Sequence, residues 1–201
     1  MQKPALIRYF DAEFEVDAVK ILPGQYHAAS GPGTITTVLG SCVSTCLWDP
    51  GTRVGGMNHF MLPGDTGAPA SPWGVSARFG VYAMEVLINE MIRMGADRRR
   101  LTAKVFGGAR VLAGMGTLDV GAKNCEFVLE FLQTENIQVA AQDLLGVHPR
   151  KLHFFPATGK VHLKKLQLAS NDIEHRRERE YRSSLAGKSG GGEIEIFKPP
   201  R

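Results

Sequence analysis

The sequence is poor in cysteine and contains no long apolar run. Three cysteines among 201 residues cannot all pair with one another, and a single bridge would not make a disulfide scaffold in a chain of this length. No stretch approaches the roughly 18 uninterrupted apolar residues that a membrane-spanning helix requires. The N-terminus alternates apolar with acidic residues and lacks the order of a signal peptide. We therefore expect reduced thiols, no membrane insertion and a cytoplasmic location.

The sequence also has little excess of charge of either sign. Its 24 Lys and Arg stand against 20 Asp and Glu, which gives a formal net charge of +4. Binding to nucleic acid needs a concentrated basic patch, and the single local cluster, Arg98 to Arg100, is typical of a solvated turn after a helix. We therefore do not expect a nucleic-acid partner.

Length and composition predict one folded domain with short additions at both ends. We expect an N-terminal segment over residues 1–24, a dense domain over 25–168 and a charged, Gly-rich tail over 169–201. In the tail, charges alternate from Asp172 to Arg182, which is typical of a solvated helix. From Ser183 onward the composition is that of a flexible linker, so we expect this part to be poorly ordered or docked elsewhere.

Strands are predicted where Thr, Val and Ile gather, and helices where apolar residues recur every three or four positions. The predicted strands cover residues 34–39, 42–48, 54–62, 101–106, 137–141, 151–155 and 161–166, and the predicted helices cover 78–94 and 123–134. Two helices against many strands, with hairpins among them, predict an α/β or α+β fold. We expect a layered sandwich of mixed β-sheets flanked by helices.

A cysteine and a histidine flank a strong turn signal in this domain. The turn lies at Asp49 to Thr52, and if Pro50 and Gly51 form its centre, Cys42 and His59 are direct cross-strand partners with Cβ atoms ~4.5–5.5 Å apart. A thiol needs a neighbouring base to become a nucleophile near neutral pH, so the spacing predicts a catalytic pair. The alternative is structural, with Cys42 a small buried residue and His59 a hydrogen-bonded strand residue.

No metal or cofactor is predicted. Cys46 lies four residues after Cys42, but the short loop between paired zinc ligands is missing and no second pair follows. Gly107 and Gly108 follow a strand without the remaining residues of a phosphate-binding loop. We expect these two glycines at a tight passage beside another backbone segment, and Cys46 in the core.

Several motifs in order resemble one known family. Leu39 to Val43 (LGSCV), Gly56 to Pro63 (GMNHFMLP) and Lys104 to Ala109 (KVFGGA) are similar to the CheD family of bacterial chemoreceptor glutamine deamidases, and so are the helix from Tyr82 to Met91 and the stretch from Arg150 to Val161. The resemblance covers roughly residues 25–166. It implies a CheD-like fold and a cysteine-dependent protein-glutamine glutaminase, which converts glutamine side chains of methyl-accepting chemotaxis receptors to glutamate and releases ammonia.

The resemblance also implies a catalytic set. Cys42 is the nucleophile, His59 the base, and the third member is a threonine six residues before the cysteine, which is Thr36; Thr37 beside it stays a rival. Family members are associated with a phosphatase, CheC, so a non-enzymatic interaction module is one alternative. A papain-like or transglutaminase-like enzyme with another amide substrate, or an esterase for receptor methyl esters, is the other.

Overall fold

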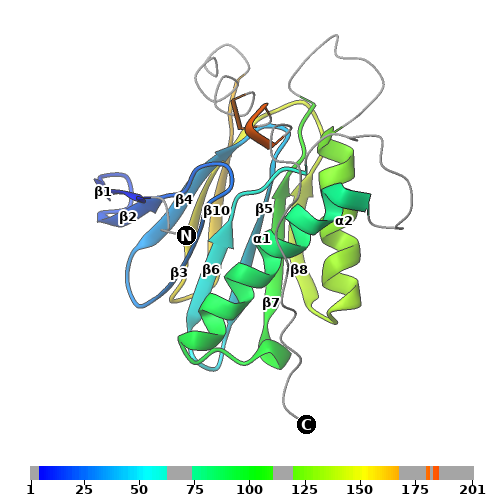
Figure 1. The fold of residues 1–201 in the computed structure, drawn as a ribbon. Coiled ribbons are helices and arrows are strands. Elements are labelled where there is room, and N and C mark those ends of the chain that lie inside the picture. Colours follow the sequence, from blue (N-terminus) through cyan, green and yellow to red (C-terminus); the bar gives the residue numbers. More distant parts are fainter. Residues whose placement is uncertain (1–4, 63–73, 111–119, 168–179, 182, 186–201) are drawn as a thin grey trace.

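Two five-stranded sheets lie face to face, and two helices cover one of them (Figure 1). The computed structural model describes residues 5–62, 74–110, 120–167, 180–181 and 183–185. The first sheet has the order β1-β2-β4-β9-β10, with β1 Ile7–Asp11, β2 Val16–Lys20, β4 Thr34–Leu39, β9 Arg150–Phe155 and β10 Lys160–Lys165. The second has the order β3-β6-β5-β7-β8, with β3 Tyr26–Ser30, β6 Val54–Asn58, β5 Val43–Asp49, β7 Thr102–Gly107 and β8 Gln138–Leu144.

Both sheets are mixed. In the first sheet β2 and β4 are parallel, and in the second β7 and β8 are parallel, while the other neighbouring strands are antiparallel. The helices are α1 (Gly74–Arg93) and α2 (Val120–Thr134), and a short 3-10 turn, η1, covers Arg98–Arg100. The predicted layered α+β sandwich of mixed sheets is confirmed.

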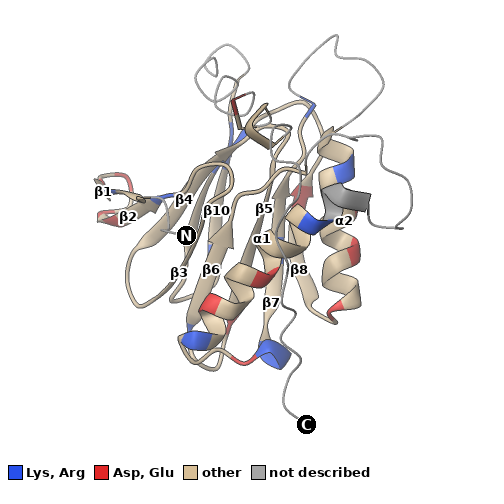
Figure 2. Ribbon diagram, viewed as in Figure 1, with Lys and Arg blue, Asp and Glu red and all other residues tan. Residues whose placement is uncertain are grey.

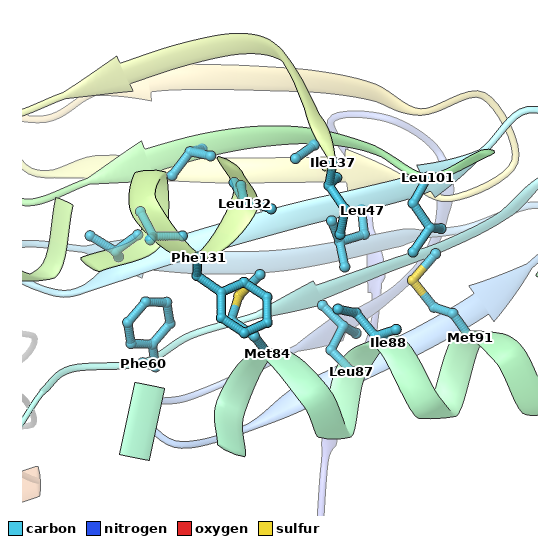
Figure 3. Packing of buried hydrophobic residues seen from close by; sticks show 14 of the residues in the cluster. Leu47, Phe60, Met84, Leu87, Ile88, Met91, Leu101, Phe131, Leu132 and Ile137 are labelled. Carbon is cyan, nitrogen blue, oxygen red and sulfur yellow. The ribbon is translucent and has the colours of Figure 1, made fainter. Parts of the chain in front are cut away.

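Side chains of the second sheet alternate between two cores. Leu47 and Val105 face the helices, where they pack with Leu87 and Ile88 of α1 and with Leu132 of α2 (Figure 3). The intervening positions face the first sheet, so Cys46, Met57 and Phe106 pack with Ile35, Leu39, Leu152 and Phe154. Successive residues of a strand point to opposite faces, and burial on both faces makes this sheet the middle layer of three.

Both helices carry charged side chains of both signs, as Figure 2 shows for α1 and α2. Within the described residues, no helix is long and apolar enough to cross a membrane.

The predicted elements from residue 34 to residue 166 correspond to strands and helices of the structure. Three strands were missed: β1 and β2, which extend the first sheet, and β3, which lies at an edge of the second. The division of the chain at residues 24 and 168 stays a prediction. Most of the helix predicted from Asp172 to Arg182 lies outside the described residues, whereas residues 183–185 are helical and Leu185 is buried.

The predicted register of the β5–β6 hairpin is wrong by two residues. Asp49 pairs with Val54, and Val43 pairs with Phe60, so His59 lies opposite position 44 rather than opposite Cys42. The connection therefore spans residues 50–53 instead of a two-residue turn, with Arg53 in the left-handed region at φ 56°. Because side chains alternate with a period of two, the displacement leaves Cys42 and His59 on the same face.

The buried carboxylate of Asp49 holds this connection. Its Oδ1 accepts from the Gly51 N–H at 2.8 Å, and its Oδ2 accepts from the Asp97 N–H at 2.9 Å. Arg100 donates to both oxygens, from Nε at 2.9 Å and from Nη2 at 2.7 Å. These hydrogen bonds hold the pKa of Asp49 well below its usual range, so the side chain stays charged. One buried carboxylate thus fixes both the loop and the register of the hairpin.

We expect Asp49→Ala to lower the free energy of unfolding by about 2–4 kcal/mol, because it leaves buried N–H donors without an acceptor. Urea denaturation followed by circular dichroism measures the change. Arg99→Ala is the matched control, since Arg99 pairs with Asp97 but its side chain is 89% exposed; its effect on the free energy of unfolding should be much smaller, because exposed ion pairs contribute little. Equal effects of the two substitutions would contradict the role given to Asp49.

Candidate active site

Cys42 lies on a short loop whose carbonyl groups are all held by the protein. The Gly40 carbonyl accepts from the Ala109 N–H at 2.8 Å, and the Cys42 carbonyl accepts from the Gly108 N–H at 2.8 Å. Between them, the Ser41 carbonyl accepts from Nδ2 of Asn124 on α2 at 2.9 Å. The backbone that carries the thiol is therefore fixed by the two residues that follow β7 and by α2.

Gly107 and Gly108 allow the close approach that these hydrogen bonds need. Gly107 has φ 120°, and a Cβ atom there would overlap the Cys42 carbonyl oxygen. Gly108 has φ 69°, and a Cβ atom there would overlap Sγ of Cys125. L side chains rarely adopt such φ values, so both positions favour glycine. The predicted tight passage beside another backbone segment is confirmed, and the backbone segment is the one that carries Cys42.

His59 is anchored through its backbone to the segment before β3. Its N–H donates to the Gln25 carbonyl at 2.9 Å, and its carbonyl accepts from the Gly24 N–H at 2.7 Å. The bridge between Val43 and Phe60 makes Cys42 and His59 diagonal neighbours on one face, a relation in which Cα atoms lie roughly 7–8 Å apart. Both side chains are buried, Cys42 at 0% and His59 at 2% exposure.

Thr37 of β4 orients the imidazole. Its Oγ1 lies 2.8 Å from Nδ1 of His59 and donates to the Ile21 carbonyl at 2.9 Å. A hydroxyl has one proton, so Thr37 must accept the second hydrogen bond, and Nδ1 carries the donated proton. Nε2 is then the basic nitrogen, and it has no hydrogen-bond partner among the described residues. The geometry fixes the tautomer that a general base requires.

Thr36, the residue that the sequence analysis favoured for this contact, faces the other way. Its Oγ1 lies 3.1 Å from the Tyr9 hydroxyl, under the β1–β2 hairpin. Ile35, Thr37 and Leu39 share the face of β4 that looks toward the second sheet, and Thr36 lies on the opposite face. The structure therefore places Thr37, the rival candidate, beside His59. The apolar neighbours at spacing two were the sequence signal for this choice.

Burial determines the charge state of the histidine. Desolvation lowers the pKa of His59 to about 3, and the positive charge of Lys20 contributes in the same direction. His59 is therefore neutral at physiological pH. Burial also raises the pKa of the Cys46 thiol far above its ordinary value, so Cys46 stays protonated in the core, as expected.

One group of described side chains has the composition of a cation site. Asp11, Glu13 and His153 each offer one ligand atom, and these atoms lie within 4.8 Å of one another. Hydrogen bonds already satisfy the Asp11 carboxylate, since Oδ1 accepts from the Glu13 and Phe14 N–H groups and Oδ2 lies 3.1 Å from Nε2 of His153. This arrangement ties the β1–β2 hairpin to β9.

The fold and the site together define an α+β protein in which two stacked mixed sheets enclose a buried cysteine and an oriented, neutral histidine. The family model described as CheD chemotactic sensory transduction matches residues 61–165. The chain belongs to the CheD family. Cys42 and His59 precede the residues that this model matches, so their roles are argued below from geometry.

Relatives match nearly the whole chain. "Probable chemoreceptor glutamine deamidase CheD 1" from Dechloromonas aromatica is 52% identical over 190 residues, which cover 94% of each chain. "Probable chemoreceptor glutamine deamidase CheD" from Thiobacillus denitrificans is 50% identical over 189 residues, again 94% of each chain. A Shewanella oneidensis relative with the same name as the first is 50% identical over 190 residues, 94% of this chain and 92% of the relative.

We expect neutral His59 to make the protein less stable in acid. Its folded pKa of about 3 lies below the unfolded value of 6.5, so the unfolded chain binds the proton more tightly. The stabilising contribution is complete above pH 6.5 and is lost as the pH falls toward 3. Between pH 7.5 and 5.0 the free energy of unfolding should fall by about 2 kcal/mol from this residue, measured by urea denaturation.

His59→Asn removes the titration and keeps an amide donor near Thr37, so its stability should depend less steeply on pH. The dependence that remains comes partly from His153, whose pKa burial also lowers. His148→Gln, at an exposed histidine, is the control and should keep the wild-type dependence. A His59→Asn variant with the full wild-type dependence would refute the buried neutral imidazole.

Proposed function

We propose that this chain is a cysteine-dependent chemoreceptor glutamine deamidase, with Cys42 as nucleophile, His59 as general base and Thr37 as the residue that positions the imidazole. The observation that carries the proposal is Nε2 of His59, a buried basic nitrogen on the same face as Cys42 that has no hydrogen-bond partner in the part of the chain that the structure describes. Buried polar atoms without a partner are rare and call for an explanation, which a general-base role supplies here. The names of the relatives supply the substrate class.

The first half of the reaction forms a thioester. Nε2 of His59 takes the proton from the Cys42 thiol as Sγ bonds to the side-chain carbonyl carbon of glutamine. Backbone N–H groups near Gly40 to Val43 are the donors that we expect to stabilise the oxyanion. The Val43 N–H already donates to the Phe60 carbonyl, so Val43 is not one of them. The tetrahedral intermediate then breaks its C–N bond, and ammonia leaves with the proton from His59.

The second half consumes one water. Neutral His59 takes a proton from water as its oxygen bonds to the thioester carbon, the C–S bond breaks, and the proton returns to Cys42. The product is glutamate, with one negative charge more than the substrate. The Thr37 hydroxyl accepts from Nδ1 throughout and stabilises the imidazolium that forms in each half, as the third member of a catalytic triad does.

Cys42→Ala should abolish deamidation, because the thioester cannot form. Incubation with a receptor cytoplasmic fragment, followed by peptide mass spectrometry, measures a gain of ~1 Da per converted glutamine. Cys46→Ala is the matched control, since Cys46 is an equally buried thiol on the same strand face, and it should keep its activity.

The same experiment separates the alternatives. An active Cys42→Ala protein would exclude the thiol mechanism, and a wild-type protein without activity would favour an interaction module. Free glutamine, other amides and receptor methyl esters, offered in parallel, separate the remaining enzymatic alternatives. A CheC-type phosphatase stays a predicted partner, tested by co-purification with the wild-type chain.

Thr37→Val should lower kcat about 10–100-fold, because the imidazole loses the acceptor that holds it in place. Thr37→Ser restores the hydroxyl and should recover most of the rate, which separates positioning from packing. Thr36→Val is the matched control on the neighbouring residue, and it removes only the contact with Tyr9. A larger loss of kcat for Thr36→Val than for Thr37→Val would restore Thr36 as the third member.

A further inference from the structure

A segment from the C-terminal part of the chain covers the candidate active site. Residues 180, 181 and 183–185 are helical and lie at one end of the two sheets, where Figure 1 draws them in orange. Leu185 is 5% exposed and belongs to the buried cluster that contains Cys42, Met61 and Phe106. The tail therefore contributes a core side chain to the space between the sheets that holds the thiol.

Tyr181 lies over the backbone that anchors His59. A Cβ atom built on Gly24 would come within 2.7 Å of Cε2 and 2.8 Å of the hydroxyl oxygen of Tyr181. The N–H of this same Gly24 donates to the His59 carbonyl. The ring thus occupies the space above Gly24 that a side chain would otherwise fill.

Tyr181 also packs against the buried cluster that contains Cys42. Burial raises the pKa of Tyr181 to about 12, and the charge of a Cys42 thiolate contributes in the same direction. Tyr181 therefore packs against the cluster of Cys42 and lies above the backbone anchor of His59. Exposure of 0% at Cys42 and 2% at His59 leaves no room for a glutamine side chain or for water.

The two covering residues have the spacing of a helix face. Tyr181 and Leu185 are separated by four positions and point to one side, while Ser183 and Ser184 between them are exposed. A helix that presents apolar side chains at this spacing fits an apolar groove, which is a common way of recognising helical partners. A glutamine side chain must reach the buried Cys42 to react, so the proposed substrate and these two side chains need the same surface above the thiol.

We propose that residues 180–181 and 183–185 are a built-in competitor of the substrate: they close the active site by docking Tyr181 and Leu185 on the surface that a receptor glutamine must reach during deamidation. The proposal rests on the proposed function for the identity of the substrate, and on the structure for the covering of the thiol. The enzyme is closed at rest, and the substrate must displace Tyr181 and Leu185 before Cys42 can react.

Alkylation of Cys42 in the full-length chain tests the cover directly. Native protein is treated with iodoacetamide, and the modified fraction of each cysteine is followed over time by peptide mass spectrometry. Tyr181→Ala and Leu185→Ala remove the two docking side chains and should each speed the labelling of Cys42 about tenfold, because local opening becomes easier. Ser183→Ala, an exposed residue of the same turn, is the matched control and should keep the wild-type rate.

Cys125 reports whether a variant merely unfolds. It is buried in the core beneath the helices, whereas Leu185 and Tyr181 pack in the cluster between the sheets that also contains Cys46, so the labelling of Cys125 should not change. Unchanged labelling of Cys42 in both docking variants would overturn the proposal. Parallel acceleration of all three cysteines would also overturn it, because the tail would then stabilise the whole fold rather than cover one site.

Activity measured on the same proteins separates this proposal from the proposed function. If both hold, Leu185→Ala raises kcat/KM for a receptor fragment, whereas Ser183→Ala leaves it unchanged. Faster labelling of Cys42 without any deamidation would support the covering of Cys42 by Tyr181 and Leu185, and it would reject receptor glutamine as the substrate. Deamidation that depends on Cys42, with the same labelling and kcat/KM in every variant, would support the enzyme and reject the cover.

Discussion

A hydroxyl group has one proton, and at Thr37 that proton goes to the Ile21 carbonyl. The hydroxyl can then only accept from His59, which fixes the hydrogen on Nδ1 and leaves Nε2 basic. This chain of two hydrogen bonds joins the first sheet to the second at the point where the candidate site lies. Backbone hydrogen bonds fix the loop of Cys42 and the segment of His59, and they thereby keep the thiol and the imidazole in place next to Thr37.

Strand alternation explains how much of this site the sequence could predict. Ile35, Thr37 and Leu39 share one face of β4, and their apolar neighbours already indicated which threonine faces the core. The count of six residues back from the cysteine favoured Thr36, because such a count ignores that successive residues of a strand point to opposite faces. Cys42 and His59 were correctly placed on one face although the predicted register was wrong, since an error of two residues preserves the face of every side chain.

The parts that the sequence did not predict depend on contacts between distant residues. The β5–β6 register is set by Asp49, whose partners Asp97 and Arg100 follow 48 and 51 positions later. Four residues of β1 are exposed, so the sequence has no buried apolar pattern that predicts this strand. The β1–β2 hairpin is held instead by the contact of Asp11 with His153. A local pattern carries no information about such partners, whereas the helices and core strands follow from local periodicity.

The closed site creates a conflict between stability and chemistry. The proposed reaction passes through an imidazolium, yet the buried environment of His59 disfavours this charged form and holds its pKa near 3. Water and substrate must reach the pair before this penalty falls, and the side chains that exclude them include Tyr181 and Leu185. Removal of these two side chains would raise the solvation of the imidazole and uncover the thiol in one step. If the proposed function holds, access to the thiol and the reactivity of the pair are controlled by the same few apolar contacts.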